Sequence, residues 1–160
     1  MPLWLRTYEI LATGPRCGLI EVVNDAKSID EIHRINLNLE DDPSATAPFG
    51  RTTLLEYFQH KYCEKTKNSL KSVHKKERKL GKEFKAAQNA FLESLAAYSL
   101  VCFVLQIKDR HNQNIMIDDE GHIVHIDFGF LLSNAPGRGL KFEKAPFKLT
   151  VEDLEVLGGE

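Results

Sequence analysis

Apolar residues change their spacing along the chain, and each change predicts a new element. Residues 3–23 hold two short runs rich in aromatic and β-branched side chains, LWLRTYEIL and GLIEVV, joined by ATGPRC. Gly and Pro in the joining segment predict two strands and a turn. From residue 84 to 107, apolar side chains recur in steps of three and four. These positions are 84, 87, 91, 95, 98, 102 and 105. Such spacing predicts a long core helix with one buried face.

Two capping boxes predict helix starts between these segments. Ser28 precedes Glu31 by three residues, and Thr53 precedes Glu56 by the same interval. In each pair the two side chains can satisfy each other's free backbone donors at the first turn of a helix. The residues between the two predicted helices, 36–50, gather Asp, Pro and Ser without periodicity, which predicts a loop.

A third pattern, NIMI and HIVHIDF on either side of DDEG, predicts a β-hairpin. If its loop centres between Glu120 and Gly121, Asn114 faces Asp127 at the open end of the hairpin. An amide oxygen beside a carboxylate suits Mg²⁺, which keeps several waters and takes phosphate oxygens as further ligands. Mn²⁺ is the alternative ion.

The residues around this hairpin have the spacing of a phosphoryl-transfer site. Asp109 precedes Asn114 by five positions, the interval in the H-R-D-x-x-x-x-N loop of protein kinases, and residues 127–129 read D-F-G. The triplet at 109–111 is D-R-H, reversed from H-R-D, which argues against an ordinary protein kinase. In this loop His111 could accept a proton or steady a phosphoryl oxygen.

Two further histidines and the three cysteines indicate packing rather than chemistry. His122 and His125 stand three apart on a predicted strand, so they point to opposite faces and do not share a metal. We interpret both as satisfied or exposed side chains. The three cysteines lie far apart without a C-x-x-C motif, which predicts small apolar fillers in a reducing compartment. They are Cys17, Cys63 and Cys102.

Composition then limits the partners. The 160 residues carry a formal net charge of −2, so no global field attracts nucleic acid. Residues 61–85 alone hold ten Lys or Arg and three Glu. They predict a solvated helix face, with contact to anionic lipid as the alternative. The longest uncharged stretch, 94–107, is shorter than the roughly 20 residues of a spanning helix, and the N-terminus lacks a signal pattern. We expect a cytosolic or peripheral protein.

The motifs DRHNQN and HIDFGF, followed by LLSNAPGRGLKFEKAPFKLT, resemble the catalytic domain of the phosphatidylinositol 3- and 4-kinases. The tail KLTVEDLEVLGG is most similar to the fungal beta type of the type III 4-kinases. The resemblance covers nearly the whole chain and is firmest over 1–35 and 84–158. Across 36–83 it is weak, which suggests a lineage-specific insertion.

The resemblance implies an α+β, protein-kinase-like fold. Residues 1–23 would be the last N-lobe strands and the hinge, and residues 24–160 a mostly helical C-lobe. Within the C-lobe, 84–107 would be the core helix, 108–130 the catalytic loop and D-F-G hairpin, and 131–150 the activation loop. No Gly-rich loop or phosphate-binding lysine precedes residue 3, and no further C-lobe helices follow residue 159. We therefore expect a fragment, with the N-lobe largely absent, that is inactive alone.

The same resemblance implies roles for residues near the hairpin. Asp109 and His111 would be catalytic, and Asn114 and Asp127 would bind the metal of Mg-ATP. Gln113 stands where the family usually has Gly, which would alter the loop without changing its acid and amide positions.

For adenine, the resemblance implies hydrogen bonds from the backbone around Glu21 and Val23. Three side chains would line the pocket: Tyr8, Met116 and Ile126. Strict alternation along the predicted hairpin places Met116 and Ile126 on opposite faces, so their joint role rests on the resemblance.

The implied reaction is transfer of the ATP γ-phosphate to the 4-hydroxyl of phosphatidylinositol by a peripheral Golgi enzyme. In the activation loop Arg138, Lys141 and Lys144 are scattered and interrupted by Glu143, which favours unmodified phosphatidylinositol over phosphorylated headgroups. Regulatory protein partners are expected but not identified. Two rival interpretations stay open: a related protein kinase, and a truncated, non-catalytic binding module.

Overall fold

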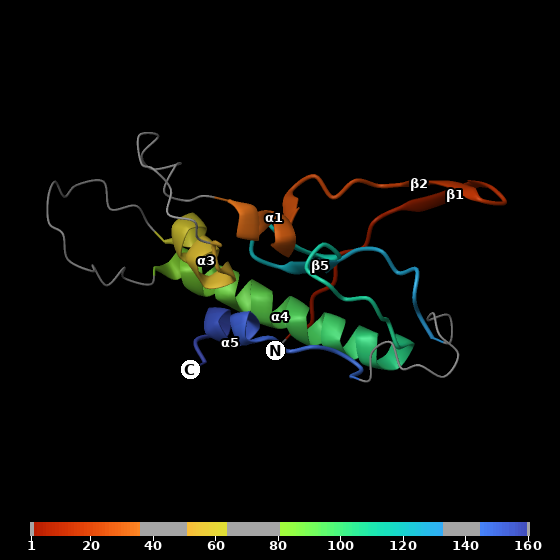
Figure 1. The fold of residues 1–160 in the computed structure, drawn as a ribbon. Helices are drawn as coiled ribbons and strands as arrows, with labels where there is room; N and C mark the ends of the chain where they lie inside the picture. Colours follow the sequence, from red (N-terminus) through yellow and green to blue (C-terminus); the bar gives the residue numbers. More distant parts are fainter. Residues whose placement is uncertain (1, 36–50, 64–80, 133–144, 160) are drawn as a thin grey trace, which may run out of the picture.

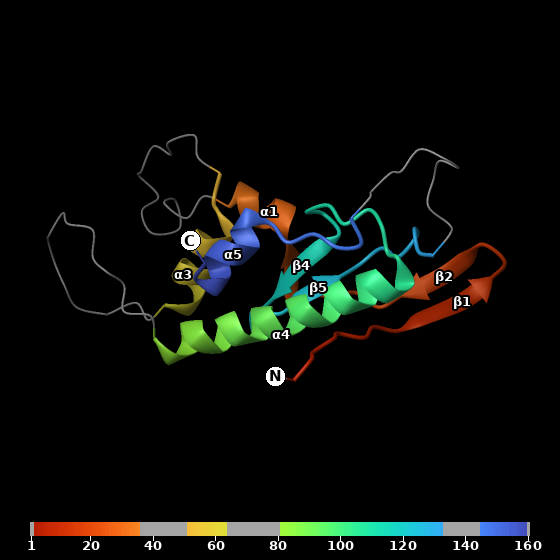
Figure 2. The ribbon, with the colours of Figure 1, turned by 90° about the horizontal axis from the view of Figure 1, so that it is seen from below.

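The long helix α4, Lys82–Leu105, runs along most of the fold in the computed structural model, which describes residues 2–35, 51–63, 81–132 and 145–159 (Figures 1 and 2). The predicted stripe is buried at positions 84, 87, 91, 98 and 102, and Leu95 packs partly buried against the core. Leu105 is 42% exposed, so the prediction was wrong in the last turn. There the helix ends at Gln106, whose φ of 49° turns the chain away.

α4 is apolar enough, by length and composition, to cross a membrane, with a mean hydropathy of 1.3 over its best window. The 14 uncharged residues at 94–107, on which the sequence-based expectation rested, are fewer than the 24 residues of the whole helix. However, its buried face carries Phe84, Phe91 and Tyr98, which pack in the core cluster with Phe58 and Ile123. Core helices of soluble proteins can have this length and composition, and the packing of α4 in the cluster is that of the core helix that the periodicity predicted.

Three shorter helices lie around α4 in the described part of the chain. The predicted capping boxes are both formed: Ser28 and Glu31 begin α1, Ile29–Arg34, and Thr53 and Glu56 begin α3, Leu54–Tyr62. A third box, at Thr150, begins α5, Val151–Leu157, and was not predicted. The loop prediction at 36–50 and most of the basic stretch lie outside the described residues.

The predicted hairpin is present, as β4, Ile115–Asp118, and β5, Ile123–His125, with β3, Ala26–Ser28, added antiparallel to β4. Its predicted register was wrong by one residue. Ile115 pairs with His125, and the carbonyl of Asn114 accepts a hydrogen bond from the N–H of Ile126 (3.1 Å), so Asn114 faces Ile126 rather than Asp127.

The turn explains this shift in register. The Asp118 carboxylate accepts hydrogen bonds from the backbone N–H groups of Glu120 (2.9 Å) and His122 (2.8 Å), so the loop closes between Asp118 and His122. A one-residue slip exchanges the faces of a strand. Met116 and Ile126 therefore lie on the same face of the hairpin, contrary to the expectation from strict alternation.

Gly121 in this turn packs directly on α4. Its φ is 98°, and a Cβ here would lie 2.9 Å from the Cβ of Ala87. An alanine here would pay both for the left-handed backbone conformation and for the close contact with α4. We therefore expect Gly121→Ala to lower the free energy of unfolding by at least about 2 kcal/mol. Gly14→Ala is the matched control, because a Cβ there would meet only Cys17 at 3.9 Å. Urea denaturation of the two variants in the full-length protein checks this, and equal midpoints would contradict it.

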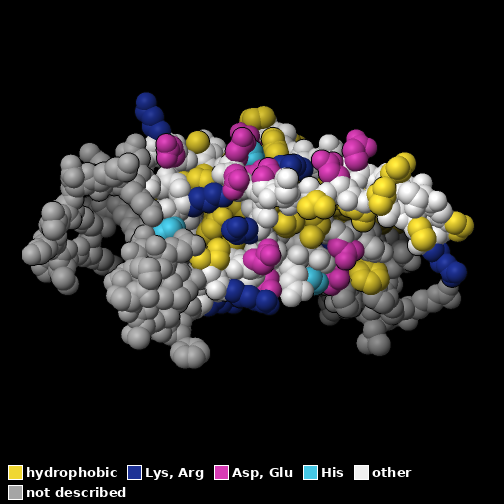
Figure 3. Space-filling view, turned by 90° about the horizontal axis from the view of Figure 1, so that it is seen from above, with side chains coloured by type: hydrophobic (Ala, Val, Ile, Leu, Met, Phe, Trp, Pro, Cys, Tyr) yellow, Lys and Arg dark blue, Asp and Glu magenta, His cyan; other side chains and the backbone are white. Residues whose placement is uncertain are grey.

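The other predicted strand pair is shifted along the chain. β1, Ile10–Gly14, pairs with β2, Cys17–Ile20, so the strand begins at Ile10 and not at Leu3. Residues 4–6 instead contact α4, where the Trp4 N–H donates to the Glu93 carbonyl (3.5 Å) and the Tyr98 hydroxyl donates to the Arg6 carbonyl (3.3 Å). The β1–β2 hairpin projects from the rest of the fold and exposes its apolar side chains (Figure 3).

The core lies between α4, the surrounding helices and one face of the hairpin. Its fully buried members include Ile32, Leu54, Phe58, Phe91, Ile117, Ile123 and Val156. Ser94 joins helix to sheet, because its buried hydroxyl donates to the Ala90 carbonyl (2.7 Å) and accepts from the Ile123 N–H (2.8 Å). Cys63 and Cys102 are buried as predicted, whereas Cys17 is exposed on β2. The fold is thus mixed α+β, as expected.

Candidate active site

The D-R-H segment and the D-F-G segment are held side by side. The loop at 108–114 follows α4, and the Lys108 N–H donates to the Phe130 carbonyl (2.8 Å). At the other end of the loop, Asn114 pairs through its backbone with Ile126, the residue before Asp127. The loop is also fixed to α1 by the Asp30 N–H, which donates to the Asn112 carbonyl (3.1 Å). The residues predicted to act together therefore belong to one backbone framework.

Asn114 and Asp127 offer oxygen atoms that suit Mg²⁺. The buried amide Nδ2 of Asn114 donates to the Asp109 carbonyl (3.1 Å), and among the described residues no hydrogen bond uses its Oδ1. Asp127 is exposed, and its Oδ1 accepts from the Gly129 N–H (3.1 Å), which leaves Oδ2 for a further partner. The described residues contain no cluster of three His, Cys, Asp or Glu able to hold a metal. An amide and a carboxylate oxygen fit an ion that also binds phosphate and water.

Asp109 and His111 lie close enough to act on one proton. Asp109 Oδ2 is 3.8 Å from His111 Nε2, and the imidazole is about half exposed. The Gln113 N–H donates to His111 Nδ1 (3.2 Å), and the Asn114 amide lies 3.2 Å from Nε2. A neutral imidazole carries one N–H, so with Nδ1 accepting from Gln113 its proton lies on Nε2, on the side of the Asp109 carboxylate.

Asp109 and Asp127 both have backbone conformations that are rare for residues with side chains. Their φ angles are 66° and 57°. Such left-handed conformations cost about 1–3 kcal/mol and cluster at functional sites, where the surrounding structure enforces them. Asp is among the residue types that tolerate this region.

The hinge residues predicted to meet adenine have a distinctive pairing. The Glu21 N–H donates to the Glu9 carbonyl (2.9 Å), but the Glu9 N–H donates to the Glu21 side chain (2.8 Å) instead of its carbonyl. The carboxylate thus replaces the carbonyl in the ladder. Val23 lies three residues before β3, whose Ser28 pairs with Met116.

Tyr8 contacts the D-F-G segment. Its ring stacks on Phe128 with 6.5 Å between centroids, and burial raises the pKa of the Tyr8 hydroxyl. Met116 and Ile126 are both half-buried. The structure therefore places Tyr8, Phe128 and Ile126 in one region, with Met116 on the Ile126 face of the hairpin.

Arg110 is a residue that the motif spacing did not single out. Its side chain is only 6% exposed, and it donates to three backbone carbonyls, those of Lys108, Ile126 and Asp127. One feature of the sequence could have drawn attention to it, since Arg110 is a cation between Asp109 and His111, the two proposed catalytic residues. The carbonyls that it meets could not be foreseen from spacing.

His122 and His125 are both buried and both have partners, in line with the interpretation that they are satisfied side chains. His122 Nδ1 lies 3.0 Å from Asp118 Oδ2, and its ring stacks on Trp4 at 3.8 Å. His125 stacks on Tyr98 at 4.3 Å. Burial, with the charge of Arg110, lowers the pKa of His125 to about 3, so this histidine is neutral at physiological pH.

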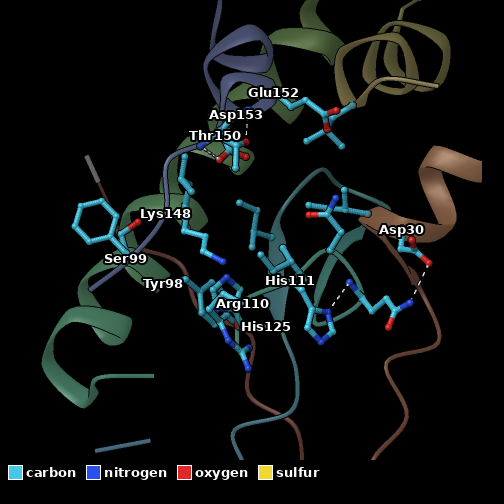
Figure 4. A pocket seen from close by; sticks show the side chains of 18 of the residues that line it. Asp30, Tyr98, Ser99, Arg110, His111, His125, Lys148, Thr150, Glu152 and Asp153 are labelled. Atoms are coloured by element: carbon cyan, nitrogen blue, oxygen red, sulfur yellow. Dashed lines mark hydrogen bonds between the residues drawn. The ribbon is translucent and has the colours of Figure 1, made fainter. Parts of the chain in front are cut away.

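A cavity of about 710 Å³ lies beside the 108–114 loop (Figure 4). Arg110, His111 and His125 lie at one end of it, and Thr150, Glu152 and Asp153 at the other. It therefore reaches from the loop to the first turn of α5. The predicted substrate residues Arg138, Lys141 and Lys144 lie outside the described residues, although Lys108 Nζ donates to the Ala145 carbonyl (3.2 Å) just beyond them.

Comparison with known proteins identifies the family of the chain. The family described as phosphatidylinositol 3- and 4-kinase matches residues 1–160, and the chain belongs to this family of lipid kinases. The chain is 46% identical over 160 residues to phosphatidylinositol 4-kinase beta 1 of Arabidopsis thaliana. The aligned region covers 100% of the chain and 12% of the relative. It is 45% identical over 159 residues to phosphatidylinositol 4-kinase PIK1alpha of Candida albicans. Here the aligned region covers 99% of the chain and 15% of the relative.

A vertebrate relative shows the same likeness. The chain is 41% identical over 159 residues to phosphatidylinositol 4-kinase beta of Xenopus laevis, with coverage of 99% of the chain and 16% of the relative. The chain spans less than one fifth of the length of these relatives, so it corresponds to part of a longer protein of this family.

Proposed function

We propose that the protein of which this chain is part transfers the γ-phosphate of ATP to the 4-hydroxyl of phosphatidylinositol. The observation that carries the proposal is the joined backbone of the catalytic loop and the D-F-G segment, which brings Asp109, His111, Asn114 and Asp127 together. In this proposal residues 1–23 form the last N-lobe strands and the hinge, and residues 24–160 belong to the C-lobe. Residues 108–130 and 131–150 are the catalytic and activation loops.

The reaction needs little covalent chemistry from the protein. A bond forms between the inositol oxygen and the γ-phosphorus, the bond to the oxygen bridging the β- and γ-phosphates breaks, and ADP leaves. Asp109 or His111 accepts the hydroxyl proton, the two groups being 3.8 Å apart. Asn114 Oδ1 and the Asp127 carboxylate would hold Mg²⁺, or Mn²⁺ in its place. When bound, the ion neutralises charge on the phosphates.

Adenine would bind at the hinge. The Glu21 carbonyl is the acceptor, because the Glu21 carboxylate has taken its place in pairing with Glu9. The Val23 N–H is the donor. Tyr8, Met116 and Ile126 form the apolar walls, which the observed hairpin register supports by placing the last two on one face.

Unmodified phosphatidylinositol is the lipid proposed as substrate. Each added phosphate on the headgroup would call for further cations, and the activation loop has only the scattered Arg138, Lys141 and Lys144. The relatives are named as phosphatidylinositol 4-kinases, several of them of the beta type. We extend this to a cytoplasmic enzyme acting peripherally at Golgi membranes, with regulatory protein partners still to be identified.

A lipid kinase assay tests the proposal. We expect the full-length protein, given labelled ATP, Mg²⁺ and phosphatidylinositol vesicles, to form phosphatidylinositol 4-phosphate. Vesicles of phosphatidylinositol 4-phosphate serve as the matched control and should yield little product. A 3-phosphate product would contradict the assignment of the hydroxyl. Labelling of protein without labelling of lipid would favour the related protein kinases, and no transfer by folded protein would favour a binding module.

A further inference from the structure

The guanidinium of Arg110 connects the two segments that carry the proposed chemistry. Nε donates to the Lys108 carbonyl (3.0 Å), Nη1 donates to the Ile126 carbonyl (2.8 Å), and Nη2 donates to the Asp127 carbonyl. Its charge also lies over the Phe128 ring, 5.6 Å from the centroid. One buried side chain thus contacts the catalytic loop and every residue from 126 to 128.

These contacts determine the backbone conformation of Asp127. The Ile126 carbonyl belongs to the peptide plane before the Asp127 Cα, and the Asp127 carbonyl belongs to the plane after it. Holding both planes fixes φ and ψ between them, because a residue has only these two soft dihedrals. Asp127 has a φ of 57°, in a region that needs support from its surroundings. Arg110 supplies that support.

The contact with Lys108 extends the same control to the catalytic loop. The Lys108 carbonyl belongs to the peptide plane before Asp109, whose φ is 66°. Arg110 itself follows Asp109 in the chain. The position of Asp109 is therefore set relative to that of Asp127 by one rigid, planar group.

We infer that Arg110 is the positioning residue that holds Asp127 in the conformation that binds the metal, and that it fixes the distance between Asp127 and Asp109. This inference rests on the proposed function and adds a residue that acts through the metal ligand rather than on the substrate. Residues that orient a metal ligand typically contribute 10–100-fold to metal affinity or activity.

The geometry requires arginine rather than any cation. A guanidinium presents five donors in a fixed plane and can reach three carbonyls in different directions from Nε, Nη1 and Nη2. A lysine has three donors on one nitrogen, so it would keep the charge but could not hold both planes around Asp127. Arg110→Lys separates the shape of the group from its charge.

The test measures Mn²⁺ binding to the full-length protein in the presence of ATP, by electron paramagnetic resonance, beside lipid kinase kinetics. For Arg110→Lys we expect Mn²⁺ affinity and kcat each to fall about 10–100-fold. The KM for phosphatidylinositol should stay within about threefold, since the lipid does not contact Arg110 in this proposal. Arg34→Lys is the control, because Arg34 has 72% of its side chain exposed and pairs with Asp30 on the same helix.

Unchanged Mn²⁺ affinity in Arg110→Lys, with or without a loss of rate, would overturn the inference. If Arg110→Lys does not fold, Phe128→Leu removes the ring under the guanidinium and should weaken Mn²⁺ binding in the same direction, whereas unchanged binding would again overturn the inference. The proposed function is judged separately, by lipid product from the wild type. Metal binding therefore decides the role of Arg110 even where that product is absent.

Discussion

Asp127→Asn is expected to reduce kcat for lipid phosphorylation by at least roughly 10³-fold, about 4 kcal/mol of transition-state stabilisation, while the protein stays folded. The loss follows from replacing a charged oxygen ligand of the metal with a neutral one. The fold survives because Asn tolerates a φ of 57° and can still accept the hydrogen bond from the Gly129 N–H. Product formation at several Mg²⁺ concentrations, with a thermal melt of each variant, checks this expectation.

Two further variants separate charge from backbone conformation. Asp127→Ala loses the carboxylate and the turn and places a strained residue at positive φ, so it should also lower the free energy of unfolding by about 1–3 kcal/mol. Asp119→Asn is the matched control, because the Asp119 side chain is 74% exposed and pairs with Lys61 on the surface. Activity of Asp127→Asn within tenfold of wild type would remove Asp127 from the metal site.

The second large effect concerns the proton acceptor. Whichever of Asp109 and His111 takes the hydroxyl proton, its neutral, similarly shaped replacement should lower kcat about 10²–10⁴-fold. Asp109→Asn and His111→Gln are the two variants, and Asn tolerates the φ of 66° at position 109. Single-turnover transfer from bound ATP measures the chemical step for each.

The double variant then shows whether the two groups act together. Their atoms lie 3.8 Å apart, and groups that act as a unit lose activity non-additively. We expect the double variant to be little worse than the poorer single one. If each single variant keeps more than a tenth of wild-type kcat, neither residue is the base. ATP affinity provides the control for Asp109→Asn, since this side chain is proposed to meet the inositol hydroxyl and not the nucleotide.

The sequence predicted the parts of the site that depend on local spacing. Asp109 and Asn114 lie five residues apart in one loop. Pairing of the two hairpin strands brings Asn114 close to the D-F-G triplet in either the predicted or the observed register. The register itself was missed, because it depends on how Asp118 binds the N–H groups of Glu120 and His122. A side chain that closes a turn by two hydrogen bonds has no signature in apolar periodicity.

Other features depend on contacts between distant segments and could not be predicted from one sequence. Residues 3–6 have the composition of a strand, yet Trp4 stacks on His122 and contacts α4 instead of pairing as β structure. Arg110 looked like the middle of a motif, and its role emerged only from the positions of the Ile126 and Asp127 carbonyls. Long-range packing outweighs local propensity at such places.

The stack of Tyr8 on Phe128 links the proposed nucleotide site to the proposed metal site. An inhibitor that needs Phe128 to swing away must first separate these rings, and it thereby removes the support of Tyr8, a proposed wall of the adenine pocket. Such an inhibitor would compete with ATP even if it never touched the adenine pocket. Drug resistance could then arise at Tyr8, far along the sequence from the D-F-G segment that the compound displaces.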